Sequence, residues 1–450
     1  MRNMIGAVLL SLLLLLPPTA AALADAGGAR AGCQVCGMYI DQYQQTTGAL
    51  KDQAGKTTQT CGVACLLRLV QDAGGPDAFA AILVRDFKTG KETQAREAVY
   101  VLSSDLTPDM MPSIIAFATR EAATSFQQEH HGELITFDQA LAVISPMAMT
   151  MPTRLQSAVL PAQGSFGLGV GGMHMEMDTA KIGSESEDPY DLVVRQGGMG
   201  PKVMTADGTM IMASYGITDA LALGVNASYL DKKMESYTMG GKGTAETINR
   251  GLSDIDVSLR YNLWKNAGYS QFVSLLGDVS LPTGEFDTAL ISMPGVQMGT
   301  GDYTLLGGLL YTYRLGDFWL HASGNYRYKL ENRDDYKFGD DRGLGLAVHY
   351  TPNYNLMVGL EADAVSTDKN EYNNVDVAKS GGFRGNLAGV ASWRFLTALG
   401  GNFSLKLAVG LPLYEDLNHE TAMGMEKTQL GGGWFGNLSL SFQRRLAVNP

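Results

Sequence analysis

Two thiols and a thioether lie close together near the start of the chain, at Cys33, Cys36 and Met38. Thiolates and thioethers are soft ligands, which suit monovalent copper better than hard cations such as magnesium or calcium. A second pair of cysteines, Cys61 and Cys65, has the spacing of one helical turn. Sulfur chemistry is therefore the first function that this sequence indicates.

The cysteine spacing alone leaves several kinds of site open. Two disulfides, one within each pair, are the ordinary expectation for an exported protein, and four thiols can also hold zinc. A redox-active pair at Cys33 and Cys36 is a further alternative. Met38 favours a metal at the first pair, whereas the second pair by itself favours a disulfide.

Further soft or borderline ligands stand later in the same part of the chain. Met111 lies on a turn between Pro108 and Pro112. His130 and His131 end a polar segment, and we interpret them as solvated surface residues. Met111 is therefore added to the candidate copper ligands.

Residues 1–24 have the features of a secretory signal peptide. Arg2 is followed by an apolar run at 5–16, and a small-residue cleavage site comes next. The apolar run is too short to cross a bilayer as a helix. Lipidation of Cys33 stays open, because two small residues precede it, although Arg30 stands where an aliphatic residue is expected. We therefore expect an exported protein.

Residues 25–145 resemble the NosL family, the accessory proteins of nitrous oxide reductase. The motifs that carry the resemblance are Cys33-x-x-Cys36-Gly-Met38-x-Ile40, Ala98-Val-Tyr-Val-Leu-Ser-Ser104, Met111-Pro-Ser-Ile-Ile-Ala-Phe117, Glu121-Ala-Ala-Thr-Ser-Phe126 and His131-Gly-Glu-Leu-Ile-Thr-Phe137. The resemblance implies binding of monovalent copper, Cu(I), in the periplasm and its delivery to a copper enzyme such as nitrous oxide reductase. By position, it makes Cys36, Met38 and Met111 the leading copper ligands.

The hydrophobic pattern of this part predicts a small α+β domain. Strands are expected at 81–87 and 99–102, and a turn followed by a helix at 112–128. A strand at 133–137 should lead into a final helix that ends at Val143.

Residues 146–162 are predicted to be a linker, because two prolines bound a segment with methionine at every second position. Methionine remains frequent beyond it, at Met173, Met175 and Met177. On a strand these three side chains share one face, and a row of thioethers fits weak, exchangeable copper binding. The alternative is that methionine serves here as a flexible apolar filler.

From residue 163 onward, apolar and polar residues alternate in about twelve segments. The segments lie near 163–177, 203–217, 220–234, 252–264, 270–284, 302–316, 318–332, 341–351, 354–368, 382–397, 402–416 and 433–446. Short turns alternate with long polar loops between them, which is typical of transmembrane barrels in bacterial outer membranes. Aromatic residues cluster at the segment ends, as expected at the two membrane interfaces.

This part also resembles the outer-membrane barrels of the putative phenol-degradation MetA transporter type. The motif Asp254-x-Asp256-Val-Ser-Leu-Arg-Tyr261, followed by Leu281-Pro-Thr-Gly284, carries the resemblance. It implies that outer-membrane lipid surrounds the barrel. Polar residues on the inward face of the strands, such as Glu361, are interpreted as an ordinary polar lumen.

The predicted architecture is multidomain: a signal peptide at 1–24, a small α+β NosL-like domain at 25–145, a linker at 146–162, and an all-β antiparallel transmembrane barrel of about 12 strands at 163–450. We expect an outer-membrane protein whose N-terminal domain hangs in the periplasm. Its metal candidates are Cys33, Cys36, Met38, Met111, Cys61, Cys65, Met173, Met175 and Met177.

The predicted function is copper handling, in which the domain binds Cu(I) and the barrel transports it or anchors the domain. The alternative is a passive channel for small organic molecules, with a disulfide-stapled structural domain. A net charge of -12 without a basic run argues against nucleic acid as a partner. No Walker loop or HExxH motif is present in the sequence, and we do not expect an enzyme.

Overall fold

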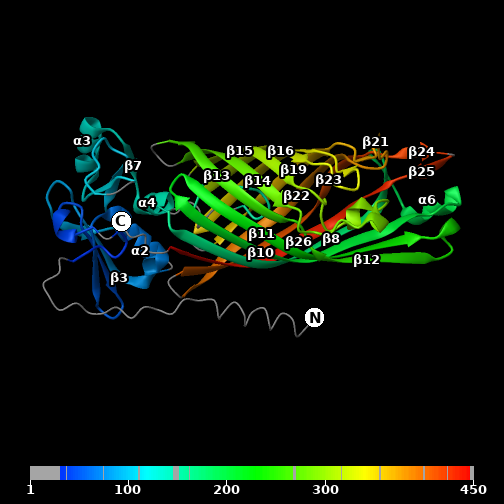
Figure 1. Ribbon diagram of the computed structural model, residues 1–450. Coiled ribbons are helices and arrows are strands. Elements are labelled where there is room, and N and C mark those ends of the chain that lie inside the picture. The colour runs from blue at the N-terminus through cyan, green and yellow to red at the C-terminus, as the bar shows by residue number, and fades with distance from the viewer. Residues whose placement is uncertain are drawn as a thin grey trace.

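The computed structural model shows a small α+β domain beyond one end of a long β-barrel (Figure 1). It describes residues 31–36, 38–73, 75–109, 112–144, 152–161, 163–266, 270–315, 317–353, 356–398, 401–422 and 424–445. The predicted signal peptide lies outside these residues.

The N-terminal domain contains two small antiparallel sheets. One has the strand order β2-β1-β3-β4, and the other has the order β6-β5-β7. The strands are β1 (Gly48–Asp52), β2 (Thr57–Thr60), β3 (Phe79–Arg85), β4 (Glu92–Gln94), β5 (Val99–Leu102), β6 (Ile114–Phe117) and β7 (Glu133–Ile135). The helices are η1 (Ile40–Gln42), α2 (Val63–Asp72), η2 (Pro76–Ala78), α3 (Arg120–His130) and α4 (Phe137–Ile144).

One apolar core joins the two sheets to helices α2 and α4. Leu66 and Leu67 from α2, Ile82 from β3, Leu102 from β5 and Leu141 from α4 are all buried in it. Burial of such aliphatic side chains is the main favourable contribution to folding. The core therefore holds α2, the helix that carries Cys65, against both sheets.

The predicted α+β class is confirmed, with one local difference. Strand β5 has the predicted bounds, but the segment before the second helix contains a strand, Ile114–Phe117, and not only a turn. All four of its residues are buried, and they pair with β5. A short, fully buried strand lacks the alternation that identifies a strand in sequence. The polar hairpin of β1 and β2 was not predicted.

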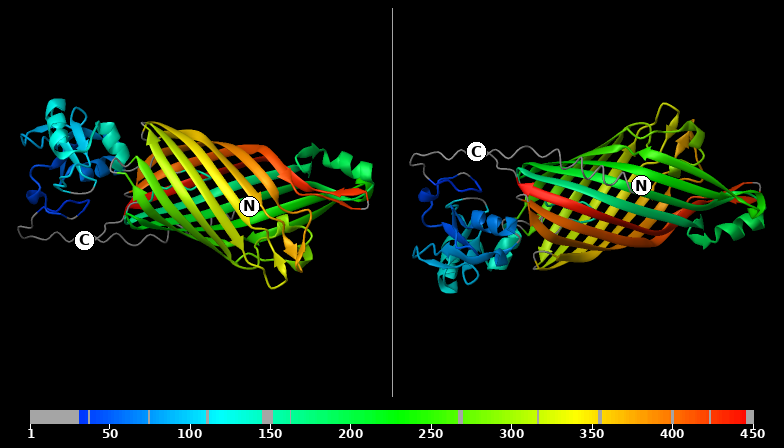
Figure 2. Two further views of the ribbon diagram at one scale, coloured as in Figure 1. Left: turned by 90° about the horizontal axis from the view of Figure 1, so that it is seen from above. Right: turned by 90° about the horizontal axis from the view of Figure 1, so that it is seen from below.

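The barrel is a closed antiparallel sheet of twelve strands, as predicted (Figure 2). Its strands are β8 (Ser165–Ile182), β10 (Gly200–Thr218), β11 (Leu221–Tyr237), β13 (Ile255–Lys265), β14 (Gln271–Leu281), β15 (Thr304–Leu315), β16 (Phe318–Lys329), β18 (Asp341–Asn353), β19 (Leu356–Thr367), β22 (Gly382–Ala398), β23 (Gly401–Leu417) and β26 (Gln429–Arg445). The first strand, β8, pairs with both β10 and the last strand, β26. Closure removes the free edges that an open sheet would expose.

The two ends of the barrel differ, as the sequence predicted. Short turns join the strands at the end next to the N-terminal domain, and long excursions extend from the opposite end (Figure 1). We call these the short-turn end and the long-loop end. The excursions contain β9 (Glu185–Glu187), α6 (Pro189–Gln196), η3 (Met239–Gly241), β12 (Thr244–Leu252), η4 (Thr288–Leu290), η5 (Pro294–Val296), β17 (Tyr336–Lys337), β20 (Glu371–Tyr372), β21 (Val375–Asp376), β24 (Glu420–Ala422) and β25 (Met425–Lys427).

The outer face of the barrel is apolar and the inner face is largely polar. Leu344, Leu346 and Val348 of β18 are exposed on the outside, whereas His349 on the same strand is fully buried inside. Trp319 departs from the predicted aromatic belt, because it points inward and packs in a buried cluster. Among the described residues, no helix is long and apolar enough to cross a membrane.

Residues 152–161 are not a free linker, contrary to the prediction, because they lie inside the barrel. The Glu361 carboxylate accepts hydrogen bonds from the backbone N–H groups of Thr153, Arg154 and Leu155, at 2.7, 2.8 and 3.2 Å. The Arg154 guanidinium pairs with Asp363 at 2.7 Å. We call residues 152–161 the lumen segment. The preceding methionines, at positions 147, 149 and 151, lie outside the described residues.

Further along, the lumen segment is held by polar contacts and by apolar packing. The backbone N–H of Ala158 donates to Thr312 Oγ1 at 3.1 Å, and Ser274 Oγ donates to the Ala158 carbonyl at 2.6 Å. Ala158 and Val159 are buried among side chains of β14, β15 and β16, including Trp319. The inward polar residues, which were interpreted from the sequence as lining an ordinary polar lumen, therefore bind the backbone of the lumen segment.

Glu361→Ala should loosen the lumen segment and raise the ion conductance of the purified protein in planar bilayers. The substitution removes three hydrogen bonds to a charged acceptor, each worth about 1.5–3 kcal/mol. Glu331→Ala, at an exposed loop position, is the matched control and should conduct like the wild type. Equal conductance of Glu361→Ala and wild type would contradict this role of Glu361.

Candidate metal centre

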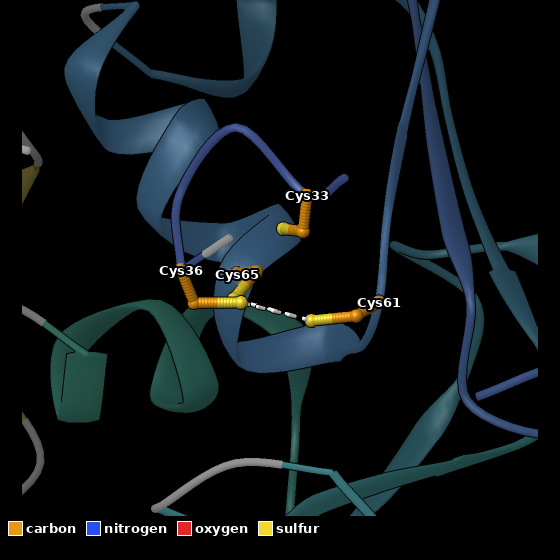
Figure 3. A group of neighbouring side chains, drawn as sticks. All are labelled: Cys33, Cys36, Cys61 and Cys65. Atoms are coloured by element: carbon orange, nitrogen blue, oxygen red, sulfur yellow. Dashed lines mark hydrogen bonds between the residues drawn. The ribbon is translucent and has the colours of Figure 1, made fainter. Parts of the chain in front are cut away.

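The four cysteines of the N-terminal domain form one cluster (Figure 3). Their Sγ atoms all lie within 4.8 Å of one another. The Sγ atoms of Cys36 and Cys61 are 3.4 Å apart, and those of Cys61 and Cys65 are 3.6 Å apart. In the part of the chain that the structure describes, this is the group of His, Cys, Asp or Glu side chains close enough to share a metal ion.

Three segments bring the sulfur atoms together. Cys33 and Cys36 lie on a tight loop, which closes where the Cys33 N–H donates to the Met38 carbonyl at 2.8 Å. Cys61 follows strand β2 directly, and the Thr46 hydroxyl donates a hydrogen bond to the Cys61 carbonyl at 3.0 Å. Cys65 lies in the first turn of α2. Cys61 therefore lies just before the helix and only Cys65 lies on it, and the sulfur atoms of both residues lie close to the loop.

The cluster is enclosed except at Cys36. Cys33, Cys61 and Cys65 are at most 2% exposed, whereas Cys36 is half-buried. Met38 packs against the cluster together with Val35 and Tyr43. A metal ion could therefore enter past Cys36 and meet three buried sulfur atoms behind it.

Hydrogen bonds within the cluster shift the pKa values of its thiols in opposite directions. The thiols of Cys61 and Cys65 donate to Cys33, which lowers the pKa of Cys33 although burial opposes the shift. The same interactions raise the pKa of Cys61 and of Cys65, and burial adds to both increases. One thiolate is thus available before the others, and a bound metal would displace the remaining thiol protons.

The sulfur separations suit a shared metal ion. A disulfide requires an S–S distance of about 2.05 Å. Four thiolates around one ion at about 2.3 Å in tetrahedral geometry are about 3.8 Å from one another. The observed separations of 3.4 and 3.6 Å are close to the second arrangement. The two cysteine pairs, which the sequence left as separate sites, are one group in space.

The predicted ligand Met111 and His130, which was interpreted as a surface residue, are not part of the described cluster. Met111 lies outside the described residues, but Asp109, which precedes it by two residues, lies against Gly62 beside the cluster. His130 Nδ1 contacts Asp105 at 2.9 Å and its ring packs on Phe126, so this histidine is engaged elsewhere.

Met173, Met175 and Met177 lie on β8 and share one face, as predicted. This face is the inner one. Met175 is opposite Phe435 of β26, and the guanidinium of Arg154, in the lumen segment, lies over the Phe435 ring. Arg384 donates to the Met177 Sδ at 3.9 Å. These three methionines belong to the barrel wall and are separate from the cysteine cluster.

The two parts of the chain match two different families. Residues 27–142 match the NosL family model. Residues 204–416 match the model described as the putative MetA-pathway of phenol degradation. No curated protein matches the chain.

Solved structures are similar to each part separately. The COG4313 outer membrane channel from Pseudomonas putida F1 is 14% identical, with 66% of this chain and 99% of that chain covered and a TM-score of 0.49. The copper chaperone NosL from Shewanella denitrificans is 24% identical, with 27% and 96% covered and a TM-score of 0.23. The NanC porin is 10% identical, with 62% and 100% covered and a TM-score of 0.33. The chain therefore joins a domain that matches the NosL family model to a closed barrel of twelve strands, part of which matches the phenol-degradation family model.

Gly62→Ala should distort the metal centre. Gly62 precedes α2 with an extended backbone, but an added Cβ would collide with the Asp109 side chain. Forcing the two segments apart should destabilise the domain by about 1–3 kcal/mol. The measurement is the rate of thiol labelling in the native protein, which should rise because all four cysteines belong to this cluster.

The double variant Gly62→Ala/Asp109→Gly is the control for this prediction. It removes the side chain that the new methyl group would strike, so slow labelling should return. Slow labelling in the single variant would show that the contact between Gly62 and Asp109 does not support the cluster.

Proposed function

We propose that this protein handles copper at the outer membrane. The N-terminal domain binds Cu(I) as cargo, and the barrel anchors that domain and provides a route for the ion. The observation that carries the proposal is the convergence of four cysteine sulfur atoms within 4.8 Å, with Met38 packed against them. An all-sulfur set with thiolates and a thioether is the set that monovalent copper prefers.

The position of the domain supports a periplasmic role. In outer-membrane barrels the short turns face the periplasm and the long loops face the outside. The domain lies beyond the short-turn end (Figure 1). A periplasmic copper enzyme such as nitrous oxide reductase, the enzyme associated with the NosL family, is the proposed class of recipient, and outer-membrane lipid surrounds the barrel.

Exchange of the ion would occur at Cys36. A half-buried thiol can contact a donor or acceptor protein, while the buried thiols behind it keep the ion from water. Cu(I) would pass by ligand exchange, in which one copper–sulfur bond forms as another breaks and the oxidation state does not change. We do not propose a catalysed reaction for this protein.

The test is a titration of the reduced full-length protein with Cu(I), without oxygen and against a competing chelator. One tightly bound ion is expected. Cys36→Ser should weaken binding by at least about 100-fold, since changes outside the ligand set already cost about 10–100-fold. Met199→Leu, at an exposed position away from the cluster, is the matched control and should bind like the wild type.

Two results would contradict copper handling. One is preferential binding of zinc, which would indicate a closed structural site of four cysteines. The other is the absence of Cu(I) binding by a protein whose cysteines resist reduction.

A passive channel for small organic molecules is the second candidate function. The match of residues 204–416 to a phenol-degradation family model favours it. The NosL-like domain would then be structural and hold no copper. Uptake of a phenolic probe by protein-containing vesicles, unaffected by Cys36→Ser, is expected from this candidate.

A further inference from the structure

One side of the barrel wall, formed by β8, β10 and β11, carries methionine on its inner face. On β10, Ile211 and Tyr215 are exposed on the outside. The side chains of Met204, Met210 and Met212 alternate with them and therefore point inward. Residues directly opposite in neighbouring strands share a face, and Met204 is opposite both Met177 of β8 and Met234 of β11.

These methionines occupy five successive inward levels. From the long-loop end, the levels contain Met204 with Met177 and Met234, then Met175, then Met173, then Met210, and then Met212. The span from Met204 to Met212 is about 27 Å at about 3.4 Å per residue. We call these residues the methionine track.

The methionine track has a packed end and a more open part: Met177, Met204 and Met234 belong to an apolar cluster with Val296 and Leu430, whereas the other four methionines lie outside that cluster. All except Met204 are partly exposed. Glycines stand beside them: Met173 is opposite Gly208, Met210 opposite Gly171, and Met212 opposite Gly169. A strand that needed only apolar bulk would favour β-branched residues here. The Met173 and Met212 side chains lie against Gly208 and Gly169, so at these two levels the thioether takes the space that a second side chain would otherwise fill.

The lumen segment makes its hydrogen bonds and ion pairs away from the methionine track, although Arg154 lies over the ring of Phe435, the residue opposite Met175, at 4.1 Å from the ring centroid. Its hydrogen bonds and ion pairs go to Arg260 of β13, Ser274 of β14, Thr312 of β15, and Glu361 and Asp363 of β19. In the order of the sheet, β13, β14 and β15 follow β11, and β19 lies further around the barrel.

The long-loop end of the methionine track has a denser group of thioethers. Met177, Met204 and Met234 cluster with Met293, which lies just before η5 in an excursion that folds onto the inner wall, and with the aliphatic side chains of Leu290, Val296 and Leu430. The Arg384 guanidinium donates to the Met177 Sδ at 3.9 Å, so an ion bound at this sulfur would have to displace that contact. Four thioethers from four segments meet at this point.

We propose that the methionine track is a relay of weak binding sites for a soft monovalent cation, with Cu(I) as the physiological ion. This proposal rests on the proposed copper function and extends it from the cysteine cluster to the barrel. Neutral thioethers bind Cu(I) without a compensating charge and release it readily. The ion moves by exchange of sulfur ligands between adjacent levels, with no change in oxidation state.

The test uses Ag(I), a redox-inert soft monovalent ion, with the full-length protein in phosphatidylcholine vesicles that contain a trapped thiol. Met173→Leu/Met210→Leu removes two adjacent levels from the middle of the track at nearly constant side-chain volume. Silver entry should fall about tenfold or more, because the wider gap raises the barrier to transfer. Potassium flux through the same vesicles should not change.

The matched control is Met199→Leu/Met239→Leu, at two methionines that are 72% and 64% exposed and lie off the track. It should transport Ag(I) like the wild type. Equal silver entry in the track variant and the wild type, or no silver entry in the wild type, would overturn the relay. Cu(I) titration of the track variant keeps this result separate from the copper function, because the cysteine cluster should bind its ion unchanged.

Discussion

The pairing of the first barrel strand with two partners is the constraint on which the rest of the barrel depends. Strand β8 forms hydrogen bonds with β10 on one side and with β26 on the other, and this closes the sheet. Because side chains alternate along a strand, a slip by one residue would turn every methionine of β8 to the outside. Closure in this register therefore determines which side chains point into the lumen, including the side chains that bind the lumen segment.

A similar dependence of local chemistry on long-range packing applies to the cysteine cluster. Its sulfur atoms come from a loop, from the end of β2 and from α2, and the core of the domain keeps these elements together. Residues 152–161 then connect the domain side of the chain to the inside of the barrel. Along the chain, the cysteine cluster thus precedes the lumen segment and the methionines of β8 follow it.

The sequence predicted the overall architecture well, because its signals were strong and local. Alternation over long segments identified all twelve barrel strands, and the spacing of Met173, Met175 and Met177 correctly placed them on one face. What failed depends on contacts distant in sequence. Nothing near Thr153 or Ala158 indicates that Glu361 and Thr312, more than 150 residues later, will accept hydrogen bonds from their backbone N–H groups. Likewise, the spacing of four cysteines could not show that Cys36 lies next to Cys61.

The most direct test of the central claim is X-ray absorption at the copper edge on full-length protein loaded with one equivalent of Cu(I). The account predicts a first shell made only of sulfur, at metal–sulfur distances near the ~2.3 Å typical of thiolate sites. The same spectrum should change when Cys61 is replaced by serine, because this residue contacts both Cys36 and Cys65 in the cluster. A first shell dominated by nitrogen or oxygen, or a spectrum indifferent to Cys61, would contradict it.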